Sequence, residues 1–388
     1  MNVGKTVFAQ LMDNLPWWRF RQCVKRYRGD YRTKSFKCAD QFRTMAFAQL
    51  TYRESLRDIQ ACFSAMRSRT YHMGIRSSVC RSTLADANEN RDWRIYADFA
   101  QTLIGEAKEI YAGEEIGADI DATVYALDSS TIDLCLSMFP WARFRKAKAA
   151  IKLHTLINVR GSIPEFIYIS EGKLHDVNVL DLLYYVAGAY YIMDRAYIDF
   201  ARLYVLHQSK AFYVLRAKRN FSYKRRYSNK VEPNSNVRSD QIVVLDGPSS
   251  SLDYPEPIRR IRYYDEENDR FFVFITNDFE SLAETIAALY KERWKVELFF
   301  KWIKQNLRIK VFYGTSPNAV KTQIWIAVCT YLLIAIVKDK LGLAQPLSQI
   351  LQVLSVVQFQ KTPIHSLFSE EDSQEPNDGS CNQLVLFD

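Results

Sequence analysis

The sequence predicts an α/β fold in which strands and helices alternate through the central part and further helices lie at both ends. Short runs rich in β-branched and aromatic residues recur between residues 121 and 220, in the order strand, hairpin, helix, strand, helix, strand. The next stretch, 221–276, has strand-like runs and loops rich in Pro, Ser and Asn, without long helical periodicity. Apolar residues at helical spacing dominate before residue 120 and after residue 277.

Length and composition indicate several structural units. The chain has 388 residues, of which 48% are hydrophobic, and this is enough for a large core and more than one domain. Its patterns predict six segments: a basic helical region (1–75), a helical connector (76–120), the first part of an α/β core (121–220), a β-rich insertion (221–276), the second part of the core (277–350), and a C-terminal helix with an acidic disordered tail (351–388).

Positive charge is concentrated near the amino terminus. The chain carries a net +8, and residues 1–81 alone contain 16 Lys and Arg against 5 Asp and Glu. This distribution indicates a polyanionic partner, with Arg26 and Arg81 as candidate contacts, and a merely solvated surface is the alternative. A second basic run, RFRKAKAAIK, offers further candidate contacts with the same alternative: Lys146, Lys148 and Lys152.

Neither the cysteines nor the apolar segments indicate an exported or membrane protein. The seven cysteines are widely spaced and include no C-x-x-C pair, which fits a reducing cytoplasm. The first residues lack the uninterrupted apolar core of a signal peptide. The longest apolar run, Ile324 to Val337, has 14 residues where a spanning helix needs about 20, so we expect a buried core helix and no membrane partner.

The segment YKERWKVELFFKWIKQ, which begins at Tyr290, predicts one amphipathic helix with an unusual polar face. At about 100° per residue, four of its side chains fall within an arc of about 60°: Tyr290, Arg293, Glu297 and Lys304. Its apolar residues occupy a different face. The alternative is an ordinary solvated face with a pair between Glu297 and Lys301.

Two apolar strands of the core end at an aspartate: Asp128 ends VYALD, and Asp194 ends YYIMD. Sites in open α/β sheets gather at the carboxyl ends of strands, so these carboxylates and Glu297 are candidate ligands of Mg²⁺ or Mn²⁺. Two such ions about 3.5–4 Å apart support phosphoryl transfer. The alternative for either aspartate alone is a helix N-cap. The nearby Asp133 and Asp199 are less favoured because neither directly ends an apolar strand.

Together these residues resemble the bacterial insertion-sequence DDE transposases of the family numbered four. The family's Y-x2-R-x3-E-x6-K signature is complete in the helix that begins at Tyr290, and its second Asp motif is similar to DRAYID, which begins at Asp194. The first Asp lies in ALDSSTIDL, with the strand KLHT following it. Each motif is weak alone, but the combination in this order is specific. The resemblance runs from about residue 122 to about residue 341.

The resemblance implies a ribonuclease H-like catalytic core, that is, a mixed sheet flanked by helices, with a β-rich insertion and a helical N-terminal DNA-binding region. It implies binding to the terminal inverted repeats of an insertion sequence, followed by metal-dependent strand cleavage and strand transfer in cut-and-paste transposition. The expected partners are double-stranded DNA, as transposon end and as target, and a second copy of the chain in a synaptic complex. The expected location is the bacterial cytoplasm, at the nucleoid, and the connector 76–120 is a candidate further DNA contact.

The resemblance also implies roles for individual residues. Asp128, Asp194 and Glu297 would form the catalytic triad and would hold two Mg²⁺ or Mn²⁺ ions. Four further side chains would contact DNA phosphates: Tyr290, Arg293, Lys304 and Arg195.

Some relatives form a hairpin intermediate and stack a flipped base on a tryptophan of the inserted segment. None of the seven tryptophans of this chain lies in residues 221–276. Tyr254, Tyr263 or Phe271 would have to take that role here.

The chain ends in QLVLFD after an acidic segment. The pattern Gln-Leu-x-Leu-Phe is similar to the peptide by which bacterial replication proteins bind the sliding clamp, and an apolar peptide on a disordered tether suits docking into a groove. The residues concerned are Gln383, Leu384, Leu386 and Phe387. The alternative is an ordinary apolar chain end.

Two other functions fit much of the same sequence. A non-catalytic DNA-binding regulator derived from a transposase would share the basic region but would have no use for three carboxylates. A related nuclease would cut DNA without joining it, and only detection of joined products separates it from a transposase.

Overall fold

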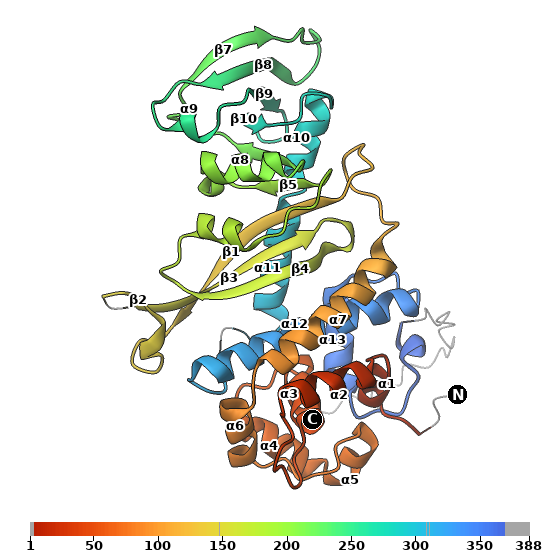
Figure 1. Ribbon diagram of the computed structural model, residues 1–388. Coiled ribbons are helices and arrows are strands. Elements are labelled where there is room, and N and C mark those ends of the chain that lie inside the picture. The colour runs from red at the N-terminus through yellow and green to blue at the C-terminus, as the bar shows by residue number, and fades with distance from the viewer. Residues whose placement is uncertain (1–3, 147, 308, 310, 369–388) are drawn as a thin grey trace, which may run out of the picture.

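One mixed β-sheet forms the centre of the protein, and helices from both ends of the chain pack beside it (Figure 1). The computed structural model describes residues 4–146, 148–307, 309 and 311–368. Within these residues the sheet has ten strands, in the order β2-β3-β1-β5-β6-β10-β9-β8-β7, with β4 paired to β3. The mixed sheet with its helices confirms the predicted α/β class.

The strands follow the predicted runs closely. Their bounds are β1 Val124–Leu134, β2 Arg143–Arg145, β3 Lys148–Asn158, β4 Ile163–Glu171, β5 Tyr190–Met193, β6 Phe212–Arg216, β7 Tyr223–Ser228, β8 Val237–Leu245, β9 Ile258–Asp265 and β10 Arg270–Thr276.

Two parallel pairings lie at the middle of an otherwise antiparallel sheet. β5 pairs in parallel with β1 on one side and with β6 on the other. The predicted hairpin is confirmed, because β3 and β4 pair antiparallel around the turn at 160–162. The helix expected before β5 is a 3₁₀ turn, η4 (Asp176–Leu182), and α8 (Phe200–Gln208) connects β5 to β6.

The predicted β-rich insertion extends this same sheet. β10 pairs antiparallel with β6, and β9, β8 and β7 follow outward from it, with the short helix α9 (Ser250–Asp253) before β9. A buried ion pair holds this part together, because Arg259 Nη2 lies 2.8 Å from Asp240 Oδ2. Arg259 also donates to the backbone carbonyl of Ser281, and this bond connects the outer strands to the loop before α10.

The helices lie mainly at one end of the molecule (Figure 1). Their bounds are α1 Val7–Asp13, α2 Trp17–Arg26, α3 Cys38–Leu50, α4 Leu56–Ala65, α5 Arg67–Thr70, α6 Arg81–Asn90, α7 Arg94–Tyr111, α10 Ala283–Lys291, α11 Trp294–Asn306, α12 Pro317–Lys340 and α13 Leu347–Val357.

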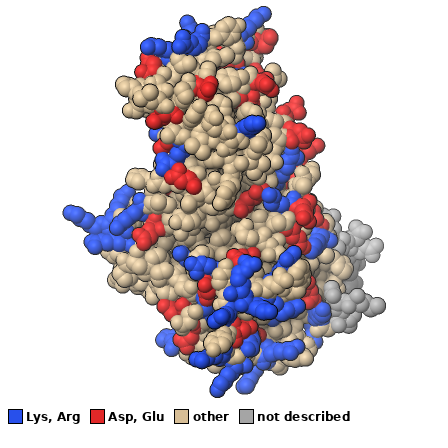
Figure 2. Space-filling model, in the orientation of Figure 1, with Lys and Arg blue, Asp and Glu red and all other residues tan. Residues whose placement is uncertain are grey.

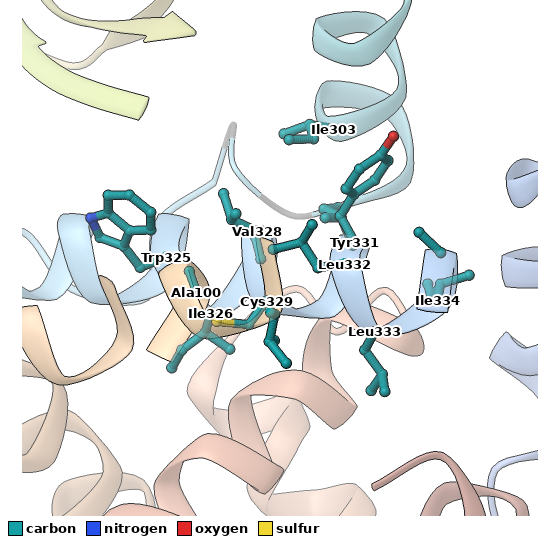
Figure 3. Packing of buried hydrophobic residues seen from close by; sticks show 14 of the residues in the cluster. Ala100, Ile303, Trp325, Ile326, Val328, Cys329, Tyr331, Leu332, Leu333 and Ile334 are labelled. Atoms are coloured by element: carbon teal, nitrogen blue, oxygen red, sulfur yellow. The ribbon is translucent and has the colours of Figure 1, made fainter. Parts of the chain in front are cut away.

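Helix α12 is the core helix of the protein. Every residue from Thr322 to Val337 is buried, which confirms the expected burial of this apolar run. In Figure 3, Val328 and Tyr331 point toward Ile303 of α11, whereas Cys329 and Leu333 point toward the helices on the opposite side. A helix that is apolar all round is typical of such a position. By length and composition α12 could cross a membrane, but 94% of its most apolar window is buried inside the protein.

The segment from Tyr290 onward is two helices and not one, so the single-helix prediction is wrong at this point. α10 ends at Lys291 and α11 begins at Trp294. Between them the amides of Arg293 and Val296 donate to carbonyls three residues earlier, in the 3₁₀ pattern. A 3₁₀ turn has three residues per turn and not 3.6, so it rotates α11 relative to a wheel drawn from Tyr290.

His154 is a packed residue of the sheet, with its side chain fully buried on β3. Its Nε2 lies 2.8 Å from Ser170 Oγ on β4. Burial lowers the pKa of His154 from 6.5 to about 4, although the nearby Asp176 opposes this shift. The folded protein therefore keeps this imidazole neutral where an unfolded chain would protonate it.

We predict that His154 contributes to acid sensitivity. Between pH 6.5 and about 4 the unfolded chain binds a proton that the folded chain does not, so the free energy of unfolding falls as pH falls through this window, by up to about 3 kcal/mol. Urea unfolding at about pH 7 and about pH 4.5 measures the loss. His154→Gln, which keeps a polar side chain beside Ser170, should lose less stability on acidification; an equal loss in both proteins would contradict the assignment.

Candidate active site

Asp128 and Asp194 lie side by side at the carboxyl end of the parallel pair β1 and β5. Leu127 pairs with Met193, so the two aspartates are the next residues of both strands. β1 does not end at Asp128 as expected. It continues to Leu134 because β3 pairs with it along that whole length. What ends at Asp128 is the pairing with β5, and this opens the sheet at the position of both carboxylates.

The two aspartates face the same side of the sheet as helix α11. Ala126 and Ile192, two residues earlier on their strands, belong to the hydrophobic core that includes Val296 and Phe299 of α11. Side chains alternate along a strand with a period of two, so Asp128 and Asp194 continue this face. The two aspartates at the carboxyl ends of this pairing therefore face the helix that carries Glu297.

Arg293 connects the strand to the helix. Its Nη1 donates to Asp128 Oδ2 at 3.3 Å, and its Nη2 donates to Glu297 Oε1 at 2.6 Å. The Arg293 side chain is largely buried. One guanidinium therefore brings the first Asp and the Glu of the signature, 169 residues apart in the sequence, to opposite sides of the same group.

The three carboxylates influence one another electrostatically. The pKa of Asp128 is raised from 3.8 to about 6, chiefly by burial. The Ser129 amide, 2.7 Å from Asp128 Oδ1, and the charge of Arg293 lower this pKa, whereas Glu297 and Asp194 raise it further. A buried carboxylate with two like charges nearby is the arrangement in which a positive ion gives most stabilisation.

The residues fit a divalent ion in kind. Three carboxylates supply the hard oxygen ligands that Mg²⁺ and Mn²⁺ prefer, and their mutual repulsion favours a cation between them. As they stand, no three His, Cys, Asp or Glu side chains among the described residues converge closely enough to hold an ion. The Arg293 guanidinium lies between Asp128 and Glu297 and supplies positive charge there, so it must shift when an ion binds both.

Tyr290 lies beside this group but is not in line with it on one helix. Its ring packs on Phe274 with centroids 4.8 Å apart, and the Arg293 guanidinium carbon lies 5.8 Å from the ring centre. Burial raises the pKa of Tyr290, and Asp194 adds to the rise. Tyr290, Arg293 and Asp194 all line one cavity of about 350 Å³.

This cavity also has residues that sequence reasoning missed: Arg216, Arg270 and Trp294. Arg216 is the last residue of β6, the strand next to β5, and a basic residue at the end of a neighbouring strand was a usable signal. Trp294 was visible inside the signature itself, and its side chain is more than half exposed beside the cavity. An exposed tryptophan next to a carboxylate is suited to contact with a base or sugar.

Lys304 and Arg195 both lie near the carboxylates, Lys304 through a contact with β1 and Arg195 as the neighbour of Asp194 in the sequence. Lys304, near the end of α11, donates from Nζ to the carbonyl of Thr131, three residues beyond Asp128 on β1. Arg195 directly follows Asp194, is exposed, and opens the 3₁₀ turn η5 (Arg195–Tyr197).

The three lysines of the second basic run are not equivalent. Lys146 and Lys148 are exposed at the tip formed by β2 and β3, where basic side chains project from the left of the molecule (Figure 2). Lys152 lies inward and donates to the Leu174 carbonyl at 2.8 Å and to Asp176 Oδ1 at 3.0 Å. Lys152 therefore stabilises the loop after β4 in this structure.

Arg26 and Arg81 lie in the N-terminal helical region and not at the carboxylates. Arg26, at the end of α2, is paired with Asp98 of α7. Arg81 begins α6 with an exposed side chain, and its backbone amide donates to Gln60 Oε1. Figure 2 shows Lys and Arg gathered over this lower part of the molecule.

Other acids near the site have structural partners. Asp199 caps α8 by accepting from the Arg202 amide, and it also pairs with the Arg202 side chain. Asp133 is exposed farther along β1. Sequence reasoning missed Asp176, whose Oδ1 accepts from Ser129 Oγ at 2.8 Å, next to Asp128.

The candidates for base stacking differ in exposure. Tyr254 is buried and cannot receive a base without rearrangement, whereas Phe271 is exposed on β10. Tyr263 lines the cavity beside Asp194. The sliding-clamp residues predicted at 383–387, and most of the predicted acidic tail, lie outside the described residues.

Comparison with protein families gives two matches. Residues 119–333, more than half of the chain and the part that holds all three carboxylates, match the family described as "Transposase DDE domain". Residues 3–76 match a family described as "Domain of unknown function (DUF4372)".

Individual relatives are similar over much of the chain. A putative transposase, y4zB, of Sinorhizobium fredii (strain NBRC 101917 / NGR234) is 29% identical over 295 residues, 74% of this chain and 78% of the relative. A probable transposase for insertion sequence element IS5377 of Geobacillus stearothermophilus is 31% identical over 216 residues, 55% of this chain and 56% of the relative. A solved synaptic complex of piggyBac transposase with hairpin DNA covers 96% of this chain and 86% of its own, with 12% identity and a TM-score of 0.42, a likeness that carries no argument.

The family match confirms the predicted family and enzyme class. Such an enzyme acts on DNA and depends on divalent metal ions, which agrees with two carboxylates at the ends of the parallel pairing and a third on the neighbouring helix α11. The chain therefore belongs to the transposase DDE domain family, and the protein is a DDE transposase of the bacterial insertion-sequence kind.

Proposed function

We propose that this transposase binds the terminal inverted repeats of an insertion sequence, cuts the DNA there and joins the freed end to target DNA. Asp128, Asp194 and Glu297 are its catalytic carboxylates. One observation carries the proposal: the parallel register of β1 and β5 puts both aspartates side by side, and Arg293 brings Glu297 to the first of them.

The three carboxylates would hold two Mg²⁺ or Mn²⁺ ions. When bound, such ions lower the pKa of an attacking water and stabilise the leaving oxygen. Asp128 and Glu297 would then no longer need the positive charge of Arg293. Arg293 Nε is buried without an acceptor among the described residues, so the released guanidinium has a free donor for a DNA phosphate.

The reaction has two displacements at phosphorus. Water first attacks the phosphodiester at the element's end, the bond to the 3′ oxygen breaks, and that oxygen leaves as a 3′-OH. The 3′-OH then attacks a phosphodiester of the target, and the target's own 3′ oxygen leaves. The second step forms one phosphodiester for each one broken, so it needs no external energy source.

The chain's own residues would position the DNA for these steps. Arg293, Arg216 and Arg270 line the cavity beside Asp194 and can bind the phosphates next to the cut, with Tyr290 in the same wall. Lys304 and Arg195 flank the carboxylates and extend this contact.

More distant basic residues would contact DNA farther from the cut. Lys146 and Lys148 project at the β2–β3 tip and suit the backbone of flanking or target DNA. Arg26 and Arg81 would act with the N-terminal region. Lys152 is the weakest of the predicted contacts because its charge is already paired with Asp176.

Two copies of the chain would hold two element ends in a synaptic complex, in the bacterial cytoplasm at the nucleoid. The C-terminal peptide around Gln383 and Phe387 would bind the sliding clamp, which would bring the enzyme to replicating DNA.

We predict that Asp194→Asn abolishes cleavage and joining but leaves DNA binding nearly unchanged. The amide keeps the size of the side chain and removes its charge, so nicking of end DNA with Mg²⁺ should fall at least about a hundredfold. Gel assays of nicked and joined products measure this loss. Asp133→Asn is the matched control. It changes an exposed carboxylate farther along β1, and the variant should cut like the unmodified protein. Nicking by both variants, or by neither the variants nor the unmodified protein, would contradict the assignment.

We predict that ion binding weakens in acid because a ligand must be ionised. With the pKa of Asp128 at about 6, Mn²⁺ affinity should fall as pH decreases below that value and stay level above it. Titration calorimetry measures this without DNA. In Arg293→Gln a charge that lowers this pKa is absent, so the fall should begin at higher pH. An unchanged midpoint would show that Arg293 does not share the site.

We predict that the purified chain retains the bacterial sliding clamp through its last residues. The double change Leu386→Ala and Phe387→Ala should abolish retention in a pull-down, because it removes the apolar anchors. Val385→Ala, at the variable position of the pattern, should leave retention unchanged. Equal retention by all three proteins would end the clamp proposal.

A further inference from the structure

A basic groove of about 810 Å³ opens in the N-terminal helical region, between α2, α3 and the turn at Gly74. Figure 1 shows α2 and α3 on the other side of α12 from the strands that carry the carboxylates. Six cationic side chains line the groove: Arg21, Lys25, Arg28, Lys37, Arg43 and Arg76. Its two acids already accept hydrogen bonds from backbone amides, Asp30 from Cys38 and Asp40 from Lys37. With six cations against two carboxylates, the lining has a net positive charge.

Arg43 is the unusual member of this set. Its guanidinium carbon lies 3.9 Å from the centre of the Trp17 ring, and the indole is itself fixed by a hydrogen bond from Nε1 to the Met12 carbonyl. Burial lowers the pKa of Arg43; the nearby Asp40 and Asp13 oppose this shift, and Arg76 adds to it. A partly buried guanidinium that lines such a groove is suited to binding an anion.

Gly74 lies beside the Arg43 guanidinium. Its φ is +77°, a left-handed conformation that favours glycine. A Cβ built there would lie 3.2 Å from Arg43 Nε, so any larger residue would press on the guanidinium. The indole of Trp17 therefore orients the Arg43 guanidinium, and the absence of a side chain at Gly74 leaves room for it.

We propose that this groove binds a phosphate of the DNA backbone, with Arg43 as its central contact and Arg76 beside it. A planar guanidinium fixed against an aromatic ring is suited to bidentate phosphate contact. The exposed cations around it add attraction through release of counterions. The inference rests on the proposed binding of element ends, and it gives the region that matches a domain of unknown function a defined contact.

The test compares duplex binding by Arg43→Met and by a matched control. Methionine keeps the apolar stem over Trp17 and removes the charge. Arg19→Met is the control, because Arg19 stacks on Trp18 at the same 3.9 Å but does not line the groove. Both changes are made in Asp194→Asn protein without metal, so that no cleavage disturbs the binding measurement. The DNA is a duplex of the element's end, titrated over a series of salt concentrations.

Arg43→Met should lose about tenfold in affinity or more, and its salt dependence should fall by about 0.9 in the slope of log affinity against log salt. Arg19→Met should keep the slope. Equal losses in the two variants would overturn the inference. If Arg43→Met fails to unfold cooperatively, Arg76→Gln replaces it in the test, since Arg76 is exposed. An unchanged salt slope in Arg76→Gln would then overturn the inference.

Two further arms separate the alternatives. In the first arm, inorganic phosphate is added and thermal stability is measured. If phosphate stabilises the unmodified protein but not Arg43→Met, and both bind the duplex equally, the groove binds a free anion and the DNA contact is overturned. Nicking of the same duplex by the unmodified protein with Mg²⁺ reports on the proposed function itself. If the unmodified protein nicks this duplex and Arg43→Met binds it normally, the proposed role of the groove is wrong, but the proposed transposase function stands.

Discussion

The parallel register of β1 on β5 is the constraint on which the site depends. It places Asp128 and Asp194 on one face of the sheet, at the point where the parallel pairing stops. A slip of one residue would turn one of these side chains to the opposite face, because side chains alternate along a strand. The alternating core residues Ala126 and Ile192 oppose that slip, since it would move them to the opposite face, where Leu127 and Met193 belong to a separate buried cluster. Packing in the core and the position of the carboxylates are therefore one requirement.

Helix α11 meets this register through charge as well as through packing. Val296 and Phe299 fix its apolar side against the sheet, and Arg293 spans the remaining distance between Asp128 and Glu297. The guanidinium balances two carboxylates that would otherwise repel each other across a partly buried interface.

Much of this was readable from the sequence, and the limits have physical reasons. Local spacing predicted that Arg293 and Glu297 lie on one face, because residues four apart share a helix face, and the two form an ion pair in the structure. The true end of β1 was not predictable, because β3 extends that strand through pairing from a distant segment. The inward turn of Lys152 and the fixed guanidinium of Arg43 depend on partners brought together only by tertiary packing. Domain boundaries drawn from composition stay a prediction.

The burial of α12 on all sides has a consequence for how such genes decay. The first helix and the segment after α13 touch directly, because the Val7 amide donates to the Gln360 carbonyl, and both ends of the chain contribute to the surroundings of α12. A copy that lacked α1 or α13 would uncover a strip of its most apolar helix to water. Such a shortened copy would be prone to aggregation or degradation, because a large apolar strip on its surface would be open to water.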